Sequence, residues 1–243
     1  MSNLYETRRL LDEYLLFHYG GSQEILPWPA GPHGALNFPV RSVTGLQPAP
    51  GGEYGRALDI GCAVGRSSFE LSKTCQSVTG IDFSHAFVNA AETIRTSGSL
   101  AYQVVEEGSF TSGHTASLPV GARPERVRFA QGDAMDLPAD LGEFDLVHAA
   151  NLICRLTEPQ RFLDRLPSLV KPGGHLLLTT PCTWLAEFTP PENMPRVRTF
   201  DWLTAQLSPA FALRRRLDIP FLIREHARKF QWSVALGTLW ERV

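Results

Sequence analysis

The sequence lacks the features that mark secreted, membrane-spanning and nucleic-acid-binding proteins. Among its 243 residues no apolar stretch approaches membrane-spanning length, and the first residues contain no basic region followed by an apolar run. The formal net charge is -2, with 23 basic and 25 acidic side chains mixed along the chain. We therefore expect a soluble cytoplasmic protein that binds neither nucleic acid nor membrane and acts on a small molecule.

Cysteine is scarce, and its spacing suggests no pairs. The four cysteines, Cys62, Cys75, Cys154 and Cys182, form no C-x-x-C motif, and each lies in or beside an apolar run. A free thiol in such a place behaves as a small hydrophobic side chain. We expect neither disulfide bonds nor a metal site.

What is present is an alternation of apolar strands and helical patterns behind an N-terminal helix. Residues 4–18 carry an i, i+4 apolar pattern that predicts a helix, and the Pro- and Gly-rich stretch 23–55 predicts a connecting loop. The expected strands cover 56–60, 77–81, 126–130, 144–149 and 175–180, and the expected helices cover 66–74, 84–95, 158–169 and 200–207. Such alternation is typical of a parallel α/β sheet with right-handed crossovers.

The length favours a single domain over residues 1–243, because 43% of the residues are hydrophobic and one large core accounts for them. Two long strands, 211–225 and 229–241, would complete the sheet as an antiparallel pair. Residues 97–125 are too long for a simple connection and contain a strand-like piece, 101–105. We interpret them as an inserted flap.

The most informative segment is the turn after the first expected strand. Asp59 precedes Gly61 and Gly65, and Asp82 ends the second strand. Glycine lets the main chain turn sharply and approach a ligand where a Cβ would intrude. Asp82 is placed to accept both hydroxyls of a ribose. The unit therefore predicts a nucleoside site.

A dinucleotide site would require G-x-G-x-x-G, and the matching positions here are Gly61, Ala63 and Arg66, so the sequence matches NAD binding poorly. The segment instead resembles the D-x-G-x-G-x-G turn of class I S-adenosylmethionine-dependent methyltransferases, with Ala63 replacing the middle glycine. This resemblance implies a Rossmann-like fold with a mostly parallel seven-stranded sheet, an antiparallel C-terminal strand pair and helices on both faces.

The same resemblance assigns the acids at the strand tips. It implies that Asp59 orients the methionyl amino group of S-adenosyl-L-methionine, Asp82 the ribose and Asp133 the adenine. The implied cofactor-binding residues are Asp59, Gly61, Cys62, Gly65, Asp82, Phe83, Gly132, Asp133, Ala134 and Asn151. Each acid alone could equally cap a following helix, and the three together, in order at the strand tips, favour the cofactor.

Longer segments are more specific, and one of them is this chain's own version of the glycine-rich turn. They are residues 3–7, 14–20, 61–66, 183–190 and 220–232. They resemble the methyltransferase domain at the C-terminus of ovothiol synthases. The resemblance implies N-methylation of the imidazole of a mercaptohistidine, the last step to ovothiol A, and pairing with a separate sulfoxide synthase. A stand-alone enzyme and an excised domain both remain open.

Methyl transfer requires a ring nitrogen held in line with the sulfonium methyl, in an enclosed pocket lined by aromatic side chains. His18 and Glu187 are the candidate bases, although His18 could be packed in the core and Glu187 solvated. Arg224 and Glu225 are candidates to bind the substrate's carboxylate and ammonium. The residues expected to contact the substrate are Tyr5, Tyr14, Tyr19, Asn151, Arg155, Trp184, Phe188, Arg224 and Glu225.

Two further segments are expected near the acceptor. Residues 1–22 would form a lid, because buried tyrosine hydroxyls need polar partners, and residues 183–210 would lie on the acceptor side. Two other functions stay open. One is methylation of another small amine, thiol or carboxylate, and the other is cofactor binding without catalysis.

Overall fold

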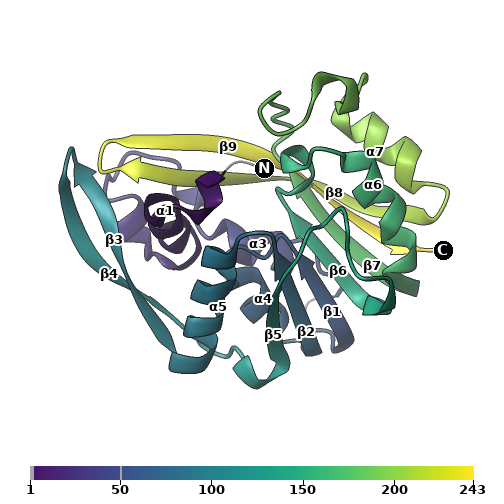
Figure 1. Ribbon diagram of the computed structural model, residues 1–243, viewed down its shortest axis with the longest axis horizontal. Helices are drawn as coiled ribbons and strands as arrows, with labels where there is room; N and C mark the ends of the chain where they lie inside the picture. The colour runs from purple at the N-terminus through teal and green to yellow at the C-terminus, as the bar shows by residue number, and fades with distance from the viewer. Residues whose placement is uncertain (1–2, 50) are drawn as a thin grey trace.

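The computed structural model describes residues 3–49 and 51–243 and shows a twisted sheet from which two hairpins project (Figure 1). The strands of the large sheet lie in the order β5-β2-β1-β6-β7-β9-β8. They are β1 Tyr54–Ile60, β2 Cys75–Asp82, β5 Val127–Gln131, β6 Phe144–Ala150, β7 Val170–Thr180, β8 Phe211–His226 and β9 Lys229–Arg242. Only β9 runs antiparallel to its neighbours β7 and β8, so the predicted Rossmann-like sheet is confirmed.

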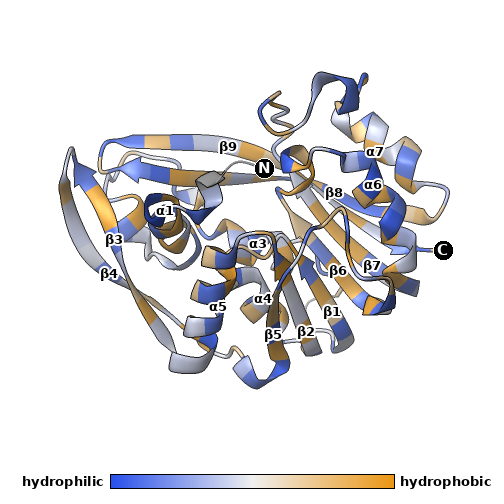
Figure 2. Ribbon diagram, in the orientation of Figure 1, coloured by the Kyte–Doolittle hydropathy of each residue, from blue (hydrophilic) through white to orange (hydrophobic). Residues whose placement is uncertain are grey.

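Helices cover both faces of this sheet, because side chains alternate along each central strand. Ala57 packs in one cluster with Phe69 and Phe87, whereas Leu58 packs in the other with Phe162. The helices are α3 Phe38–Thr44, α4 Arg66–Leu71 and α5 His85–Ser97 on the first face, and α6 Pro159–Arg165 and α7 Thr199–Leu207 on the second. Figure 2 shows hydrophobic residues concentrated on the central strands. Within the described residues, no helix is long and apolar enough to cross a membrane.

The N-terminal region contains more helix than the sequence predicted. A 3-10 turn, η1 Asn3–Glu6, leads into α1 Arg8–Tyr19, as expected. The stretch 23–55 was predicted as a loop, and that prediction was wrong. It contains part of α2 Ser22–Ile25, η2 His33–Ala35 and all of α3. Pro39 is typical of a loop, but it lies in the first turn of α3. A proline there costs no helical hydrogen bond, so the helix forms in spite of it.

The inserted segment 97–125 is a β-hairpin. Its strands, β3 Ser99–Glu107 and β4 Phe110–Ser117, pair antiparallel and form a sheet of their own. In Figure 1 this hairpin and the outer halves of β8 and β9 project to the same side, with α1 between them. The insertion therefore forms one wall of the space that holds the N-terminal helix.

Arg224 joins this hairpin to the rest of the molecule. Its guanidinium is buried, forms an ion pair with Glu106 at 2.5 Å, and donates to the main-chain oxygen of Glu24. Ser112 donates to the other oxygen of Glu106 at 2.6 Å, and His114 contacts the Glu24 carboxylate at 2.9 Å. Arg224 does not line the pocket described below. The structure therefore does not place Arg224 where it was predicted to bind the substrate. Its two terminal nitrogens donate to Glu24 and Glu106, and its buried Nε has no hydrogen-bond partner among the described residues.

Replacing Arg224 with methionine should lower the free energy of unfolding by about 2 kcal/mol, because a charge-assisted hydrogen bond contributes about 1.5–3 kcal/mol. Urea denaturation measures this change. Arg228, exposed in the turn between β8 and β9, is the matched control. The free energy of unfolding of its methionine variant should stay within about 0.5 kcal/mol of that of the unmodified chain. Equal stability of the two variants would contradict the bridging role.

Candidate active site

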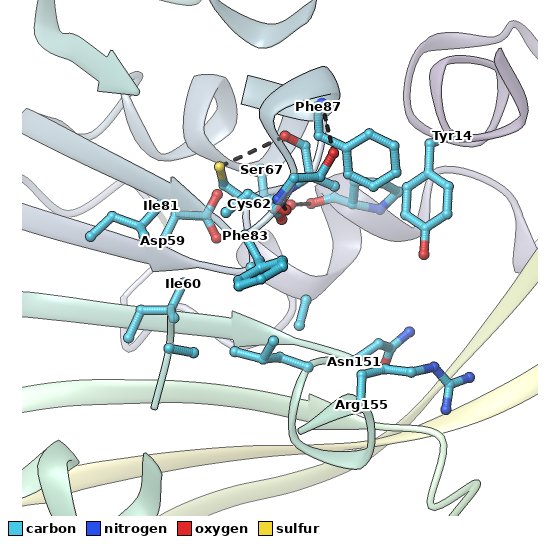
Figure 3. Close-up of a pocket in the computed structure, with 18 of the residues that line it drawn as sticks. Tyr14, Asp59, Ile60, Cys62, Ser67, Ile81, Phe83, Phe87, Asn151 and Arg155 are labelled. Atoms are coloured by element: carbon cyan, nitrogen blue, oxygen red, sulfur yellow. Dashed lines mark hydrogen bonds between the residues drawn. The ribbon is translucent and has the colours of Figure 1, made fainter. Parts of the chain in front are cut away.

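A pocket opens at the carboxyl ends of β1, β2, β5 and β6, where ligands collect in sheets of this kind (Figure 3). Most of the predicted cofactor residues lie in its wall. They are Asp59, Gly61, Cys62, Asp82, Phe83, Gly132, Asp133, Ala134 and Asn151. Segments from three separate crossovers therefore meet at one cavity. No cluster of three or more metal-ligating side chains occurs in the part of the chain that the structure describes.

The glycine-rich turn follows β1 directly. Gly61, Ala63 and Gly65 all have positive φ, at 72°, 46° and 85°. Gly65 does not line the pocket, and a Cβ there would lie 2.6 Å from the Phe129 ring and 2.9 Å from Ala91. Gly65 therefore lets the turn pack closely against α5 and β5, which corrects its predicted contact with the cofactor.

The Asp82 carboxylate is held by main-chain donors on both oxygens. It accepts from the amides of Ala63 at 2.8 Å and Ser84 at 2.9 Å. Burial is the largest cause of a rise in the pKa of Asp82 to about 6, and these two hydrogen bonds act in the opposite direction and lower it. Ser84 caps α5 by accepting from the Phe87 amide at 3.1 Å. Asp82 is therefore not the helix cap, and its carboxylate faces the pocket.

Asp59 lies deeper, with 1% of its surface exposed. One carboxylate oxygen accepts from the Ser68 hydroxyl at 2.6 Å, and the other contacts Nδ1 of His148 at 2.7 Å. His148 also lines the pocket, and sequence reasoning missed it. The signal was the strand register, which pairs Asp59 with His148 across β1 and β6 and cannot be read along one segment.

Asp133 and Asn151 are two further polar residues in the pocket wall. Asp133 accepts from the Met135 amide at 2.8 Å, so one of its oxygens also shapes the turn after β5. Asn151 has φ of 54°, and its side-chain oxygen accepts from Thr179 at 3.0 Å. This bond fixes the amide of Asn151 at the end of β6.

The N-terminal segment is attached directly to the loop that carries Asp82. The Glu6 carboxylate accepts from the amides of His85 at 2.9 Å and Ala86 at 3.1 Å, at the start of α5. Ser84 donates to the main-chain oxygen of Tyr5 at 2.9 Å. These bonds place η1 over one side of the pocket.

Aromatic rings from the N-terminal segment form an aromatic wall, defined here by Tyr5, Tyr14 and His18. Tyr14 stacks on His18 at 5.8 Å between ring centroids and meets the edge of Tyr5 at 6.4 Å. In Figure 3 the Tyr14 hydroxyl points across the cavity toward the side that holds Asn151 and Arg155. Sequence reasoning missed further apolar lining residues, namely Phe17, Phe38, Pro39, Phe87, Phe221 and Ile223.

His18 lies in this wall as a neutral ring. Burial is the largest cause that lowers its pKa to about 3. Its Nδ1 is buried and has no hydrogen-bond partner among the described residues. An unpaired buried nitrogen is costly, so this atom is suited to a hydrogen bond from a ligand.

Arg155 is the one Lys or Arg side chain among the described lining residues. Its guanidinium lies 4.6 Å from the Phe188 ring centroid and donates to the main-chain oxygen of Thr183 at 3.2 Å. Burial raises the pKa of Tyr5, and the neighbouring Arg155 opposes that rise. A fixed cation therefore faces the pocket beside a phenol.

The remaining predicted substrate contacts lie outside the pocket lining. The Tyr19 hydroxyl donates to the main-chain oxygen of Val64 at 2.7 Å and so supports the glycine-rich turn. Trp184 is partly buried, packs against the core and donates to Thr199 at 2.9 Å. Glu225 forms an ion pair with Lys229. These three predictions are corrected, because each side chain has a structural partner elsewhere.

Two other predicted residues also lie beyond the lining. Glu187 is exposed on the loop after β7, which corrects its interpretation as a base. Phe188 does not line the pocket but touches two residues that do, Arg155 and, at 6.5 Å between ring centroids, Tyr5. All four thiols are free, and Cys182 is exposed, unlike the other three.

Comparison with known proteins agrees with this site. Residues 58–178 match a family described as a methyltransferase domain. This part of the chain is a methyltransferase domain. The solved N-methyltransferase NodS from Bradyrhizobium japonicum WM9, in complex with S-adenosyl-L-homocysteine, superposes with a TM-score of 0.57 at 17% identity and covers 99% of each chain. At this level of identity the likeness shows that the two proteins share a fold.

Curated relatives match less of the chain. A demethylmenaquinone methyltransferase of Clavibacter sepedonicus is 29% identical over 156 residues, which are 64% of this chain and 50% of that protein. A ubiquinone biosynthesis O-methyltransferase of Coxiella burnetii is 25% identical over 51% of this chain and 42% of its own length. The chain thus spans about half the length of the first of these relatives.

Proposed function

We propose that this methyltransferase transfers a methyl group to an imidazole nitrogen of a mercaptohistidine. One observation carries the proposal. The pocket that holds Asp59 and Asp82 continues into the aromatic wall and contains a single guanidinium, that of Arg155, among its described lining residues. A flat ring that bears a carboxylate suits this combination, because the rings can stack and the guanidinium can pair with the carboxylate. The phrases shared with ovothiol synthases point to the same acceptor.

The residues present fit S-adenosylmethionine. Asp82 would accept from the ribose hydroxyls, and Asp133 from the adenine amino group, since both side chains face the pocket at neighbouring strand tips. Asp59, at the pocket floor, would accept from the methionyl ammonium. When bound, the cofactor supplies an electrophilic methyl group on a sulfonium.

On the acceptor side, Arg155 replaces Arg224 as the side chain that binds the carboxylate. The stacked rings of Tyr14 and His18 would fix the orientation of the substrate's imidazole ring. Nδ1 of His18 would accept a hydrogen bond from the ring N–H of the substrate, which leaves the other ring nitrogen with its lone pair free. A nitrogen with a pKa of about 3 holds a proton weakly, so we assign His18 to orientation and not to proton removal.

The reaction then requires little acid–base chemistry from the protein. The free nitrogen lone pair forms the N–C bond while the methyl–sulfur bond breaks, and the departing thioether is neutral and needs no proton. The ring proton of the methylated imidazolium leaves to solvent. The contribution of the aromatic wall is to orient the ring, a term that can reach about 7–11 kcal/mol.

A phenolic ring is the second candidate acceptor. Two similar curated proteins carry names from menaquinone and ubiquinone methylation, and an aromatic wall also suits a quinol. Arg155 favours the amino acid, because a quinol ring offers no carboxylate to a guanidinium. Another small amine or thiol with a carboxylate would use the same two features.

Labelled donor incubated with 5- or 4-thiohistidine, histidine, cysteine and a hydroquinone tests the proposal. We expect label in the thiohistidine, and an NMR spectrum of the product should place the methyl on a ring nitrogen. Label on sulfur, or only in the hydroquinone, would refute the proposed acceptor. An exposed-loop variant, Glu187→Gln, is the control and should methylate at the unmodified rate.

A further inference from the structure

The floor of the pocket contains a buried polar chain that extends away from the ligand. Asp59 contacts Nδ1 of His148 at 2.7 Å, and Nε2 of His148 contacts the Ser42 hydroxyl at 3.1 Å. Ser42, on α3, donates to the main-chain oxygen of Pro39 at 3.1 Å. Asp59, His148 and Ser42 are each at most 1% exposed.

One proton along this chain follows from the chemistry of its groups. A carboxylate only accepts hydrogen bonds, so the contact of 2.7 Å between Nδ1 of His148 and Asp59 requires an N–H at Nδ1. The Ser42 hydroxyl can donate to Nε2 or accept from it, because the main-chain oxygen of Pro39 also accepts from the Ser67 hydroxyl at 3.0 Å.

We propose that His148 is a positioning residue for the cofactor. It fixes the orientation of the Asp59 carboxylate by donating from Nδ1 to one of its oxygens. Ser68 donates to the other oxygen of Asp59, so the carboxylate cannot turn. The remaining lone pairs then face the pocket, where an ammonium can donate to them. The inference concerns the donor alone, so its outcome does not depend on the acceptor.

Other groups near Asp59 bear on its charge. Asp82 and Cys62 interact with it electrostatically from β2 and the glycine-rich turn, and His18 does so from α1. None of them contacts Asp59 through a hydrogen bond that the structure records. His148 and Ser68 are the two side chains that do.

Replacing His148 with leucine tests this role, with donor affinity measured by calorimetry at pH 7. The variant removes the N–H that holds one oxygen of Asp59, so the carboxylate is no longer fixed on both sides. We expect donor affinity about tenfold lower than in the unmodified protein.

Two matched variants separate positioning from packing. Asparagine at 148 offers an N–H near the position of Nδ1, so His148→Asn should restore most of the affinity. Ser42→Ala removes only the far end of the chain and should bind the donor within about threefold of the unmodified protein. Unchanged donor affinity in the leucine variant, or equal losses of affinity for leucine and asparagine, would overturn the proposal.

A second measurement needs no variant. The nitrogen-15 NMR signals of His148 in the unmodified protein at pH 7 should show a proton on Nδ1. A bare Nδ1 would overturn the proposal even if the leucine variant does not fold.

Discussion

Asp82→Ala should weaken binding of S-adenosylmethionine by about 1–3 kcal/mol, or about 5- to 150-fold, since the variant loses the acceptor for two ribose hydroxyls. The carboxylate is already held by the amides of Ala63 and Ser84, so it is oriented before the ligand arrives. Calorimetric titration measures the change. Asp140, exposed and remote from the pocket, is the control, and Asp140→Ala should bind the donor normally.

The pH dependence gives the Asp82 prediction a second readout. The pKa of Asp82 is raised from 3.8 to about 6, so the carboxyl gains a proton as the pH falls through about 6. A protonated carboxyl has fewer acceptor sites, and donor affinity should fall below that pH. Asp82→Asn mimics the protonated form and should bind weakly, without the inflection near pH 6. An unchanged inflection in that variant would assign the titration to another group.

The same shift predicts an effect of Asp82 on stability. Because the folded state binds this proton more tightly than the unfolded chain, Asp82 lowers folding stability progressively as the pH rises from about 4 to about 6. The ionised form of Asp82, which donor binding requires, is therefore the form that folding disfavours.

Arg155→Met should raise the Michaelis constant for a carboxylate-bearing acceptor by about 10- to 150-fold, because a hydrogen bond to a charged group contributes about 1.5–3 kcal/mol. Donor affinity should stay unchanged. Arg155→Lys keeps the charge and loses the planar fork, so it should recover only part of the effect. Steady-state kinetics at saturating donor measure these constants.

A matched control distinguishes Arg155 from surface arginines. Arg161 is exposed, pairs with Asp136 and does not line the pocket, so Arg161→Met should leave both constants unchanged. If Arg155→Met weakened donor binding and left the acceptor constant alone, Arg155 would belong to the cofactor site. An acceptor without a carboxylate should be insensitive to both variants.

Much of the sheet could be predicted, because burial leaves a periodic trace in the sequence. The central strands β1, β2, β6 and β7 are short apolar runs buried on both faces, and the segments between them carry helical patterns. The stretch 23–55 gave no such trace. Its helices are short, and Pro39 and the nearby glycines are also typical of loops.

Local sequence also predicted that Asp59, Asp82 and Asp133 lie together, since residues that follow parallel strands meet at one edge of the sheet. Local sequence failed for Arg224, because an arginine in this segment suggested a side chain that binds the carboxylate of the substrate. The partner is Glu106 of the inserted hairpin, which lies 118 residues earlier in the chain. A charged side chain reveals what it can bind, but only folding decides which partner reaches it.

The sequence by itself determined the order of strands and helices and the placement of Asp59, Asp82 and Asp133 at strand ends, because these follow from local periodicity and turn chemistry. The tertiary structure alone decided that His148 lies beside Asp59 and that the stacked rings of Tyr14 and His18 line the same pocket as Arg155. Those contacts depend on strand register and on how the N-terminal helix packs, and both are set by interactions between segments far apart in the chain.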